Sequence, residues 1–346
     1  MVRVGRAREI ASRWVAEHAA GAPGFAGAYL SGSATWLPGE AELPAASDVD
    51  VMVVTCGSRA PAKLGKFLRE GVMVEVTYVP WEQIRSAEVV LGSCHLAGGL
   101  RGGNVIADPT GRLARLQAKV AEGYTRRRWV RARCEDAELR IVAGLGAVEA
   151  SAPVHDRVLG WVFPTGVTTH VLLSAGLRNP TVRLRYLAVR GLLAEYGHLD
   201  VHERLLELLG CARMSAARVG YHLAAMARVF DATVPVARTP LLFSSDITAA
   251  ARPIAVGGGC ELIGRGLHRE AVFWIVVTYA RCLKILASDD PAAGERFSAG
   301  FGELLGDLGV VSPGGLAGRG REVLGFLPRL REVAESVMAA NPGIRD

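Results

Sequence analysis

Two aspartates one residue apart open a strongly apolar segment, and this spacing constrains the fold more than any other feature of the chain. The segment reads Asp48-Val49-Asp50-Val51-Met52-Val53-Val54. Side chains alternate between the two faces of a β-strand, so Asp48 and Asp50 are expected on one face and the valines on the other. We therefore expect a sheet that buries its valine face and gathers carboxylates on the opposite face.

Two further segments are expected to lie beside this strand. The first is a short apolar run that ends at Gly32-Ser33, and the second is Val72–Val79, which carries Glu75. Three carboxylates on neighbouring strands would repel, because two unit charges about 4 Å apart cost roughly 4 kcal/mol at an effective dielectric of 20. A divalent cation removes that cost, since hard cations prefer oxygen ligands. The sequence thus predicts a metal site at Asp48, Asp50 and Glu75; a solvated polar strand face is the alternative.

The order Gly-Ser, Asp-hydrophobic-Asp and a later strand-borne acid, between Ala28 and Val79, resembles the nucleotidyltransferase superfamily. This polymerase-beta-like group includes aminoglycoside nucleotidyltransferases. The resemblance implies two Mg²⁺ ions and a nucleoside triphosphate donor, with ATP favoured. It implies transfer of the nucleoside monophosphate to a hydroxyl of a small molecule, such as an antibiotic or a secondary metabolite, with release of pyrophosphate. Asp48, Asp50 and Glu75 would be the catalytic and metal-binding residues, and Glu75 has a second possible role as general base.

The resemblance also implies nucleotide-binding residues in both halves of the chain. Gly32 would let the backbone approach the phosphates, and Ser33 would hydrogen-bond a phosphate oxygen. A plain helix N-cap is the alternative for Ser33. In the second half, a predicted helix over 267–287 carries Tyr279, Arg281 and Lys284, which would reach the triphosphate or the base. Here the alternative is a solvated helix edge with an aromatic core contact.

The distribution of strand and helix signals predicts two domains. Strands are expected at 27–31, 48–54, 72–79 and 104–107, with helices over 3–19 and 60–71. From about residue 111 onward the sequence predicts helices, and Gly257-Gly258-Gly259 is expected to be a loop. The expected fold is α/β plus all-α: a nucleotidyltransferase-type small mixed sheet with helices in a catalytic domain at 1–120, then a helical bundle at 121–346 that closes over nucleotide and acceptor.

Composition narrows the class of protein. Forty basic and 34 acidic residues give a net charge of +6, which suits an anionic ligand such as a nucleotide without requiring nucleic acid. Six scattered cysteines without a C-x-x-C pair indicate free thiols in a reducing cytoplasm. The N-terminus lacks the apolar core of a signal peptide, and the apolar run 271–280 is too short to span a bilayer. We expect a cytoplasmic protein with no membrane partner and a buried helix at 271–280.

A basic cluster between Arg126 and Arg133 leaves a different acceptor open. Nucleotide transfer to a protein or an RNA, as in toxin–antitoxin modules, would use such a surface. We favour a solvated face, because Glu135, Asp136 and Glu138 follow closely and are expected to neutralise it. A non-catalytic nucleotide-binding protein that kept the fold is the other alternative.

Overall fold

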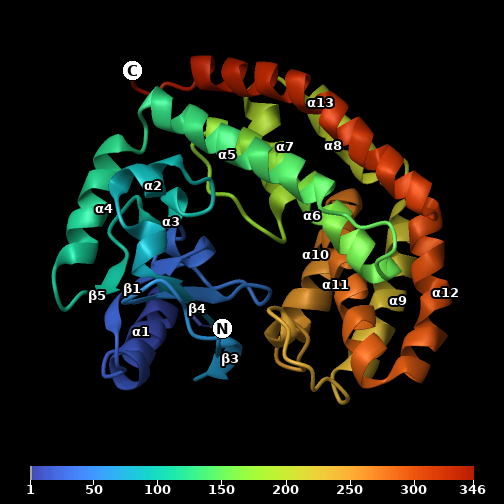
Figure 1. The fold of residues 1–346 in the computed structure, drawn as a ribbon, viewed down its shortest axis with the longest axis horizontal. Helices are drawn as coiled ribbons and strands as arrows, with labels where there is room; N and C mark the ends of the chain where they lie inside the picture. The colour runs from blue at the N-terminus through green and yellow to red at the C-terminus, as the bar shows by residue number, and fades with distance from the viewer. Residues whose placement is uncertain (1) are drawn as a thin grey trace. The chain divides into compact units, whose positions relative to one another are not determined.

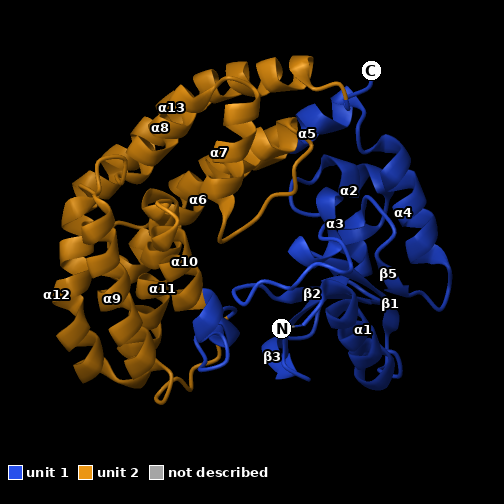
Figure 2. Ribbon diagram, turned by 180° about the vertical axis from the view of Figure 1, so that it is seen from behind, with its two compact units in different colours: residues 1–133, 242–254, 343–346 blue, residues 134–241, 255–342 orange. Residues whose placement is uncertain are grey.

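The computed structural model describes residues 2–346 as a mixed α/β protein. Those residues form 13 helices, with 61% of the chain helical, and one five-stranded mixed sheet (Figure 1). The chain divides into two compact units, coloured separately in Figure 2. The first unit holds residues 1–133, 242–254 and 343–346, and the second holds 134–241 and 255–342. No pattern in the sequence indicates that the two later segments join the first unit.

The sheet lies wholly in the first unit and has the strand order β3-β4-β2-β1-β5. Its strands are β1 (Phe25–Ser31), β2 (Val49–Thr55), β3 (Gly65–Arg69), β4 (Val72–Pro80) and β5 (Val105–Ala107). β2 and β4 are parallel, and the other neighbouring pairs are antiparallel. The four predicted strands are confirmed within one or two residues, and the sheet is mixed as expected.

The helix predicted over 60–71 is wrong, because this segment ends in a β-hairpin. β3 joins β4 through the two-residue turn Glu70-Gly71, whose φ angles are +47° and +75°. Two successive positive φ angles give the hairpin turn that matches the natural twist of paired strands. The apolar residues of 60–71 recur at a spacing that also fits a helix face, but Phe67 instead packs its ring 5.5 Å from that of Trp14.

One face of the sheet is covered by the N-terminal helix, which confirms the helix predicted over 3–19. α1 (Val4–Trp14) continues as a π-helical turn (Val15–Ala19). Its apolar face packs on Val49, Val51 and Val53, all of them almost completely buried. The shorter helices of this unit are η2 (Ser33–Thr35), η3 (Trp81–Ile84), α2 (Ala87–Gly92), α3 (Ala97–Leu100), α4 (Arg112–Gly123) and η4 (Ser244–Asp246). Since α1 takes the valine face, the aspartates of β2 are left on the other face.

The second unit is helical throughout, as predicted for the second half of the chain. Its helices are the later part of α5 (Arg127–Gly146), then α6 (Val154–Ala175), α7 (Arg185–Glu195), α8 (Leu199–Leu209), α9 (Ala216–Thr233), α10 (Gly258–Gly264), α11 (His268–Asp289), α12 (Pro291–Asp307) and α13 (Pro313–Ala340). α11 packs against α6, α9, α10 and α12. The buried helix predicted at 271–280 is confirmed as part of α11.

The loop predicted at Gly257-Gly258-Gly259 is wrong, since these glycines are helical. They join a π-helical turn (Pro253–Gly257) to α10. A Cβ added at Gly259 would lie 2.9 Å from Leu223 Cδ1 of α9, so the glycine permits a close approach of two helices. Tertiary packing here outweighs the low helix propensity of glycine.

Two helices of the second unit, α6 and α11, are long and apolar enough to cross a membrane by length and composition alone. In each of them 72% of the apolar window is buried inside the structure. This burial is what the core helices of a soluble protein show.

Candidate functional site

The three predicted acids lie together on the face of the sheet opposite α1. In the ladder, Asp50 of β2 is paired with Glu75 of β4, and Glu75 is paired with Lys66 of β3. Directly paired residues point to the same face, so these side chains form a row across three strands. Asp48 lies two residues before Asp50 and points the same way. One carboxylate oxygen each from Asp48, Asp50 and Glu75 lie within 4.8 Å of one another.

Two lysines and a fourth acid complete this group, and sequence analysis missed all three. Lys66 Nζ lies 3.2 Å from Asp48 Oδ2, 2.6 Å from Glu75 Oε2 and 2.7 Å from Asp246 Oδ1. Lys63 Nζ donates to the other oxygen of Glu75. Asp246 arrives from η4, 180 residues further along the chain than Lys66. We call Asp48, Asp50, Glu75, Asp246, Lys63 and Lys66 the acid cluster.

The sequence does contain a local pattern that would have placed Lys66 beside Glu75. Glu70-Gly71 is flanked by Gly65-Lys66-Phe67-Leu68-Arg69 on one side and by Val72–Val79 on the other. An X-Gly pair between two such runs is typical of a two-residue hairpin. With that hairpin, Lys66 falls directly opposite Glu75. No comparable signal identifies Asp246, because its contact is made only by the tertiary fold.

Burial and charge give the acids of this cluster different pKa values. Burial, reinforced by Asp48 and Glu75, holds the pKa of Asp50 well above its usual range. Burial also raises the pKa of Asp48, although Lys66 opposes this. Burial alone would raise the pKa of Glu75, but Lys66 and Lys63 outweigh it and bring the pKa to about 2. Glu75 is therefore firmly ionised.

Burial and neighbouring charges also act against each other on the pKa of Lys66. Burial disfavours its ammonium, but Asp48, Asp246 and Glu75 outweigh burial and hold the pKa above the usual range for lysine. By contrast, Asp50 forms no hydrogen bond or ion pair with another side chain in residues 2–346. In this cluster the ammonium group of Lys66 contacts three carboxylates, whereas the carboxylate of Asp50 contacts no cationic side chain.

Gly32 lies directly against that carboxylate. Its φ is +65°, and a Cβ added there would overlap Asp50 Oδ2. Only glycine fits this combination of positive φ and close approach without a shift of Asp50. Ser33 begins η2 immediately afterwards and is exposed to solvent. The structure therefore brings Gly32 next to Asp50, with Ser33 following it in η2, and the role of both residues in phosphate binding stays a prediction.

The donor set of the cluster fits a hard divalent cation such as Mg²⁺. It offers carboxylate oxygens only, and those of the triad lie close enough to share one ion. Lys63 and Lys66 occupy both oxygens of Glu75, and Lys66 contacts one oxygen of Asp48. Asp50, with no such partner, and Asp48 are accordingly the residues that would hold the ion.

The three residues expected to bind nucleotide from the helical half all lie on α11 of the second unit. Tyr279 is only 1% exposed, its hydroxyl donates to Phe297 O at 3.1 Å, and its ring centroid lies 5.1 Å from that of Phe301. A side chain buried in this way has no free face for a nucleobase, so the prediction for Tyr279 is corrected to a core contact. An aromatic core contact is the alternative that the sequence analysis gives for this helix.

Arg281 and Lys284 have partners within the same unit. The guanidinium of Arg281 lies 5.4 Å from the ring centroid of Phe163 and 5.3 Å from that of Trp274. Lys284 Nζ lies 2.5 Å from Asp156 Oδ1, and both side chains are about one third exposed, at 34% and 31%. Lys284 therefore keeps an accessible ammonium, and its role in nucleotide binding stays a prediction.

The arginines between 126 and 133 are engaged by their own unit. Arg133 is 2% exposed and donates to the carbonyl oxygens of Leu91 and Tyr124. Arg126 pairs with Glu122 at 3.0 Å, and Arg127 pairs with Asp346 at 3.0 Å. For Arg126 and Arg127, the neutralising partners are thus Glu122 and Asp346 rather than the expected Glu135, Asp136 and Glu138. A solvated and partly buried set of ion pairs describes this stretch better than a nucleic-acid surface.

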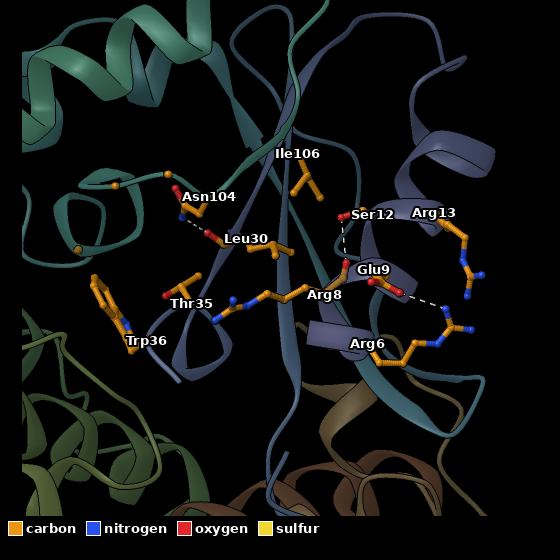
Figure 3. Close-up of a pocket in the computed structure, with 13 residues that line it drawn as sticks. Arg6, Arg8, Glu9, Ser12, Arg13, Leu30, Thr35, Trp36, Asn104 and Ile106 are labelled. Carbon is orange, nitrogen blue, oxygen red and sulfur yellow. Dashed lines mark hydrogen bonds and ion pairs between the residues drawn. The ribbon is translucent and has the colours of Figure 1, made fainter. Parts of the chain in front are cut away.

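A separate cavity of about 760 Å³ lies on the α1 side of the sheet (Figure 3). Its lining includes Arg6, Arg8 and Arg13 of α1 and Leu30 of β1, but none of the acid cluster. Arg8 reaches across the cavity towards Thr35 in Figure 3, and it donates to the carbonyl oxygens of Ala34 and Leu37 at 2.7 and 2.6 Å. These bonds hold the η2 turn that follows Gly32. The cavity is therefore separate from the acid cluster, and Arg8 in its lining holds the turn that follows Gly32.

No protein-family model matches the chain, and neither a curated protein nor a solved structure gives a significant match. The function is accordingly inferred from the chemistry of the site itself.

Proposed function

We propose that the protein is a Mg²⁺-dependent nucleotidyltransferase that transfers a nucleoside monophosphate to a hydroxyl of a small molecule. The observation that carries this proposal is the meeting of Asp48, Asp50 and Glu75, with oxygens within 4.8 Å, beside the Gly32-Ser33 turn. A structural ion-pair network would not require a half-buried carboxylate, Asp50, that lacks a cationic contact. The ionised form of such a carboxylate is costly, and a bound cation would offset that cost.

In the proposed reaction, the acceptor hydroxyl oxygen forms a bond to the α-phosphorus of the nucleoside triphosphate. The bond from that phosphorus to the β-bridging oxygen breaks, pyrophosphate leaves, and the hydroxyl proton passes to solvent or to a base. When bound, Mg²⁺ supplies Lewis-acid stabilisation of the charge on the reacting oxygens. Gly32 leaves room for the phosphates to approach the backbone, and Lys63, whose side chain is 28% exposed, adds positive charge beside them.

Glu75 fits the role of an anchor for the two lysines better than that of general base. Both of its oxygens accept hydrogen bonds from ammonium groups. A general base works best when its pKa lies near the operating pH, and the pKa of Glu75 is about 2. In this arrangement Glu75 fixes Lys66 and Lys63 and adds negative charge to the metal site.

The proposed donor is a nucleoside triphosphate, with ATP favoured, and the proposed acceptor is a hydroxylated small molecule in the cytoplasm. Lys284 and Arg281 are proposed as the second unit's contacts to the nucleotide. A protein or RNA acceptor is not supported by any described contact, since Arg126, Arg127 and Arg133 all have partners. The non-catalytic alternative has one observation in its favour: Lys63 and Lys66 already neutralise two carboxylates without a metal.

A thermal-shift titration with ATP, GTP, CTP and UTP, with and without Mg²⁺, tests nucleotide binding at the site, and a transfer assay then separates the catalytic proposal from the non-catalytic alternative. Binding to the native state stabilises by about 2.7 kcal/mol when ligand is at a hundred times its Kd. We expect a Mg²⁺-dependent shift with one nucleotide that is absent in Asp50→Asn and retained in Glu149→Gln, a control at an exposed acid. Pyrophosphate release with a panel of hydroxylated acceptors then tests transfer. A shift that survives Asp50→Asn, or its absence with every nucleotide, would contradict the proposal.

A further inference from the structure

The ammonium of Lys66 is fully occupied within the acid cluster. It lies 3.2 Å from Asp48 Oδ2, 2.6 Å from Glu75 Oε2 and 2.7 Å from Asp246 Oδ1. A lysine ammonium has three N–H donors, and here it meets three carboxylate oxygens. Only 9% of the Lys66 side chain is exposed. Lys66 is therefore placed to neutralise the cluster and has no donor left for a substrate phosphate.

The net charge of the cluster matches one divalent cation. With every group ionised, its four carboxylates carry −4 and its two ammonium groups carry +2, so the cluster carries −2. One ion of charge +2 brings this to zero, whereas two ions would leave +2 in a site whose five ion-paired side chains are 9% to 28% exposed. Uncompensated charge in such a place is strongly unfavourable.

The hydrogen bonds of the cluster indicate where that cation would bind. Both oxygens of Glu75 accept from lysines, so Glu75 has little capacity left as a ligand. Asp50 contacts neither ammonium group, and Asp48 contacts Lys66 through one oxygen. The available oxygens are thus concentrated on the two aspartates of β2, beside Gly32.

We propose that Lys66 is a built-in counter-cation that takes the place of one of the two metal ions, so that the site binds one divalent cation on Asp48 and Asp50. Asp246 is then a positioning residue that holds the ammonium of Lys66 from the side of η4. This inference rests on the proposed function only in taking the acid cluster as the metal site. It replaces the two ions implied by the resemblance with one ion and one lysine.

The direct test is a titration of the full chain with Mn²⁺ alone, in which free Mn²⁺ is followed by electron paramagnetic resonance. We expect one equivalent bound by the wild type and more than one by Lys66→Met. A second ion would leave the wild-type cluster at +2, but it brings the variant cluster, which carries −3, only to +1. Lys119→Met, a change at an exposed lysine of α4, should still bind one equivalent. Two equivalents or none in the wild type, or an unchanged single equivalent in Lys66→Met, would overturn the proposal.

Lys66→Met places three carboxylates against each other and can fail to fold, so a second variant is needed. Asp246→Asn keeps a polar partner for Lys66 and changes the net charge to −1. We expect its Mn²⁺ Kd to rise about tenfold or more, although Asp246 is not a proposed metal ligand. An unchanged Kd would overturn the proposal, since the coupling through Lys66 would then be absent.

These measurements use neither nucleotide nor acceptor, so they can fail separately from the proposed function. One equivalent of Mn²⁺ without nucleotidyl transfer would defeat the proposed function and support the role of Lys66. Transfer by an enzyme that binds two equivalents would support the function and overturn the role of Lys66.

Discussion

The sequence predicts a metal site at Asp48, Asp50 and Glu75 of the first unit and nucleotide-binding residues on α11 of the second unit, and the two sets differ in how far other side chains already satisfy them. Asp48, Asp50 and Glu75 meet on one face of the sheet, and Asp50 among them has no cationic side chain in contact. Tyr279 of α11 is instead buried in the core of the second unit, and Lys284 forms an ion pair with Asp156. One carboxylate of the first set has no cationic contact, whereas much of the second set is already paired or packed.

The difference reflects how each prediction is made. In a strand the side-chain period is two, and the ladder then fixes which residues of neighbouring strands stand side by side. Alternation places Asp48 and Asp50 on one face, and the register of the ladder then pairs Asp50 with Glu75. On a helix, spacing tells only which residues share a face, and the partners of that face come from distant segments. Lys284 and Asp156 lie 128 residues apart, so no local pattern indicates their contact.

The largest expected effect is on the metal ligands. Asp48→Asn and Asp50→Asn should each lower Mg²⁺-dependent transfer by about a thousandfold or more, which corresponds to roughly 4 kcal/mol of lost transition-state stabilisation. Pyrophosphate release measures this effect. Turnover within about tenfold of the wild type in either variant would contradict the assignment.

Thermal unfolding of the same variants without metal provides the control for folding. Asp50→Asn should be at least as stable as the wild type, because it removes a buried carboxylate that lacks a cationic contact and faces two other acids. Marked destabilisation would show that Asp50 has a structural role instead.

The next largest effect is expected at Gly32. Gly32→Ala should cost on the order of 1–3 kcal/mol for its backbone conformation alone, since φ +65° with ψ −160° is a region that essentially only glycine adopts, and more because its Cβ would overlap Asp50 Oδ2. Gly71→Ala is the control for a positive φ without a close contact, since its φ is +75° and no other described atom lies within 4 Å of its added Cβ. Urea unfolding of both variants separates backbone strain from the contact with Asp50. Equal losses of stability in the two would contradict a close approach at Gly32.

Much of the first unit is predictable because its signals are local. The strand positions and the turn at Gly32-Ser33 follow from alternation and turn residues, whereas the pairing of Asp50 with Glu75 also requires the strand order and register of the sheet. The helix wrongly predicted over 60–71 shows the limit of periodicity, since its apolar spacing fits a helix while the Glu70-Gly71 turn favours a hairpin. A greater weight on the turn would place Lys66 opposite Glu75 from the sequence alone.

The remaining parts of the site depend on contacts that sequence spacing does not encode. Asp246 reaches Lys66 only because the segment 242–254 belongs to the first unit. A Cβ added at Gly65 would overlap Ser245 Oγ, so a glycine at the start of β3 permits that segment to pack closely. Such a contact is fixed by tertiary packing and requires the structure.

A smaller effect is expected at Tyr279. Tyr279→Phe should lower the free energy of unfolding by about 1 kcal/mol, because it removes the hydroxyl that donates to Phe297 O inside the core. Tyr221→Phe is the control, since Tyr221 is 43% exposed and bonds Glu303 at the surface, where the loss should be smaller. The nucleotide KM of Tyr279→Phe should not change. A raised KM with unchanged stability would restore Tyr279 to the nucleotide site.

The smallest effect is expected at Lys284, where a local ion pair competes with a proposed phosphate contact. Lys284→Ala should raise the nucleotide KM a few-fold, whereas Asp156→Asn should lower it or leave it unchanged, because it frees the ammonium. Both side chains are about one third exposed, so the loss of stability should stay within about 1 kcal/mol. Lys119→Ala controls for loss of an exposed lysine. If both Lys284→Ala and Asp156→Asn raise KM equally, the ion pair supports the fold of α11 and Lys284 does not contact the nucleotide.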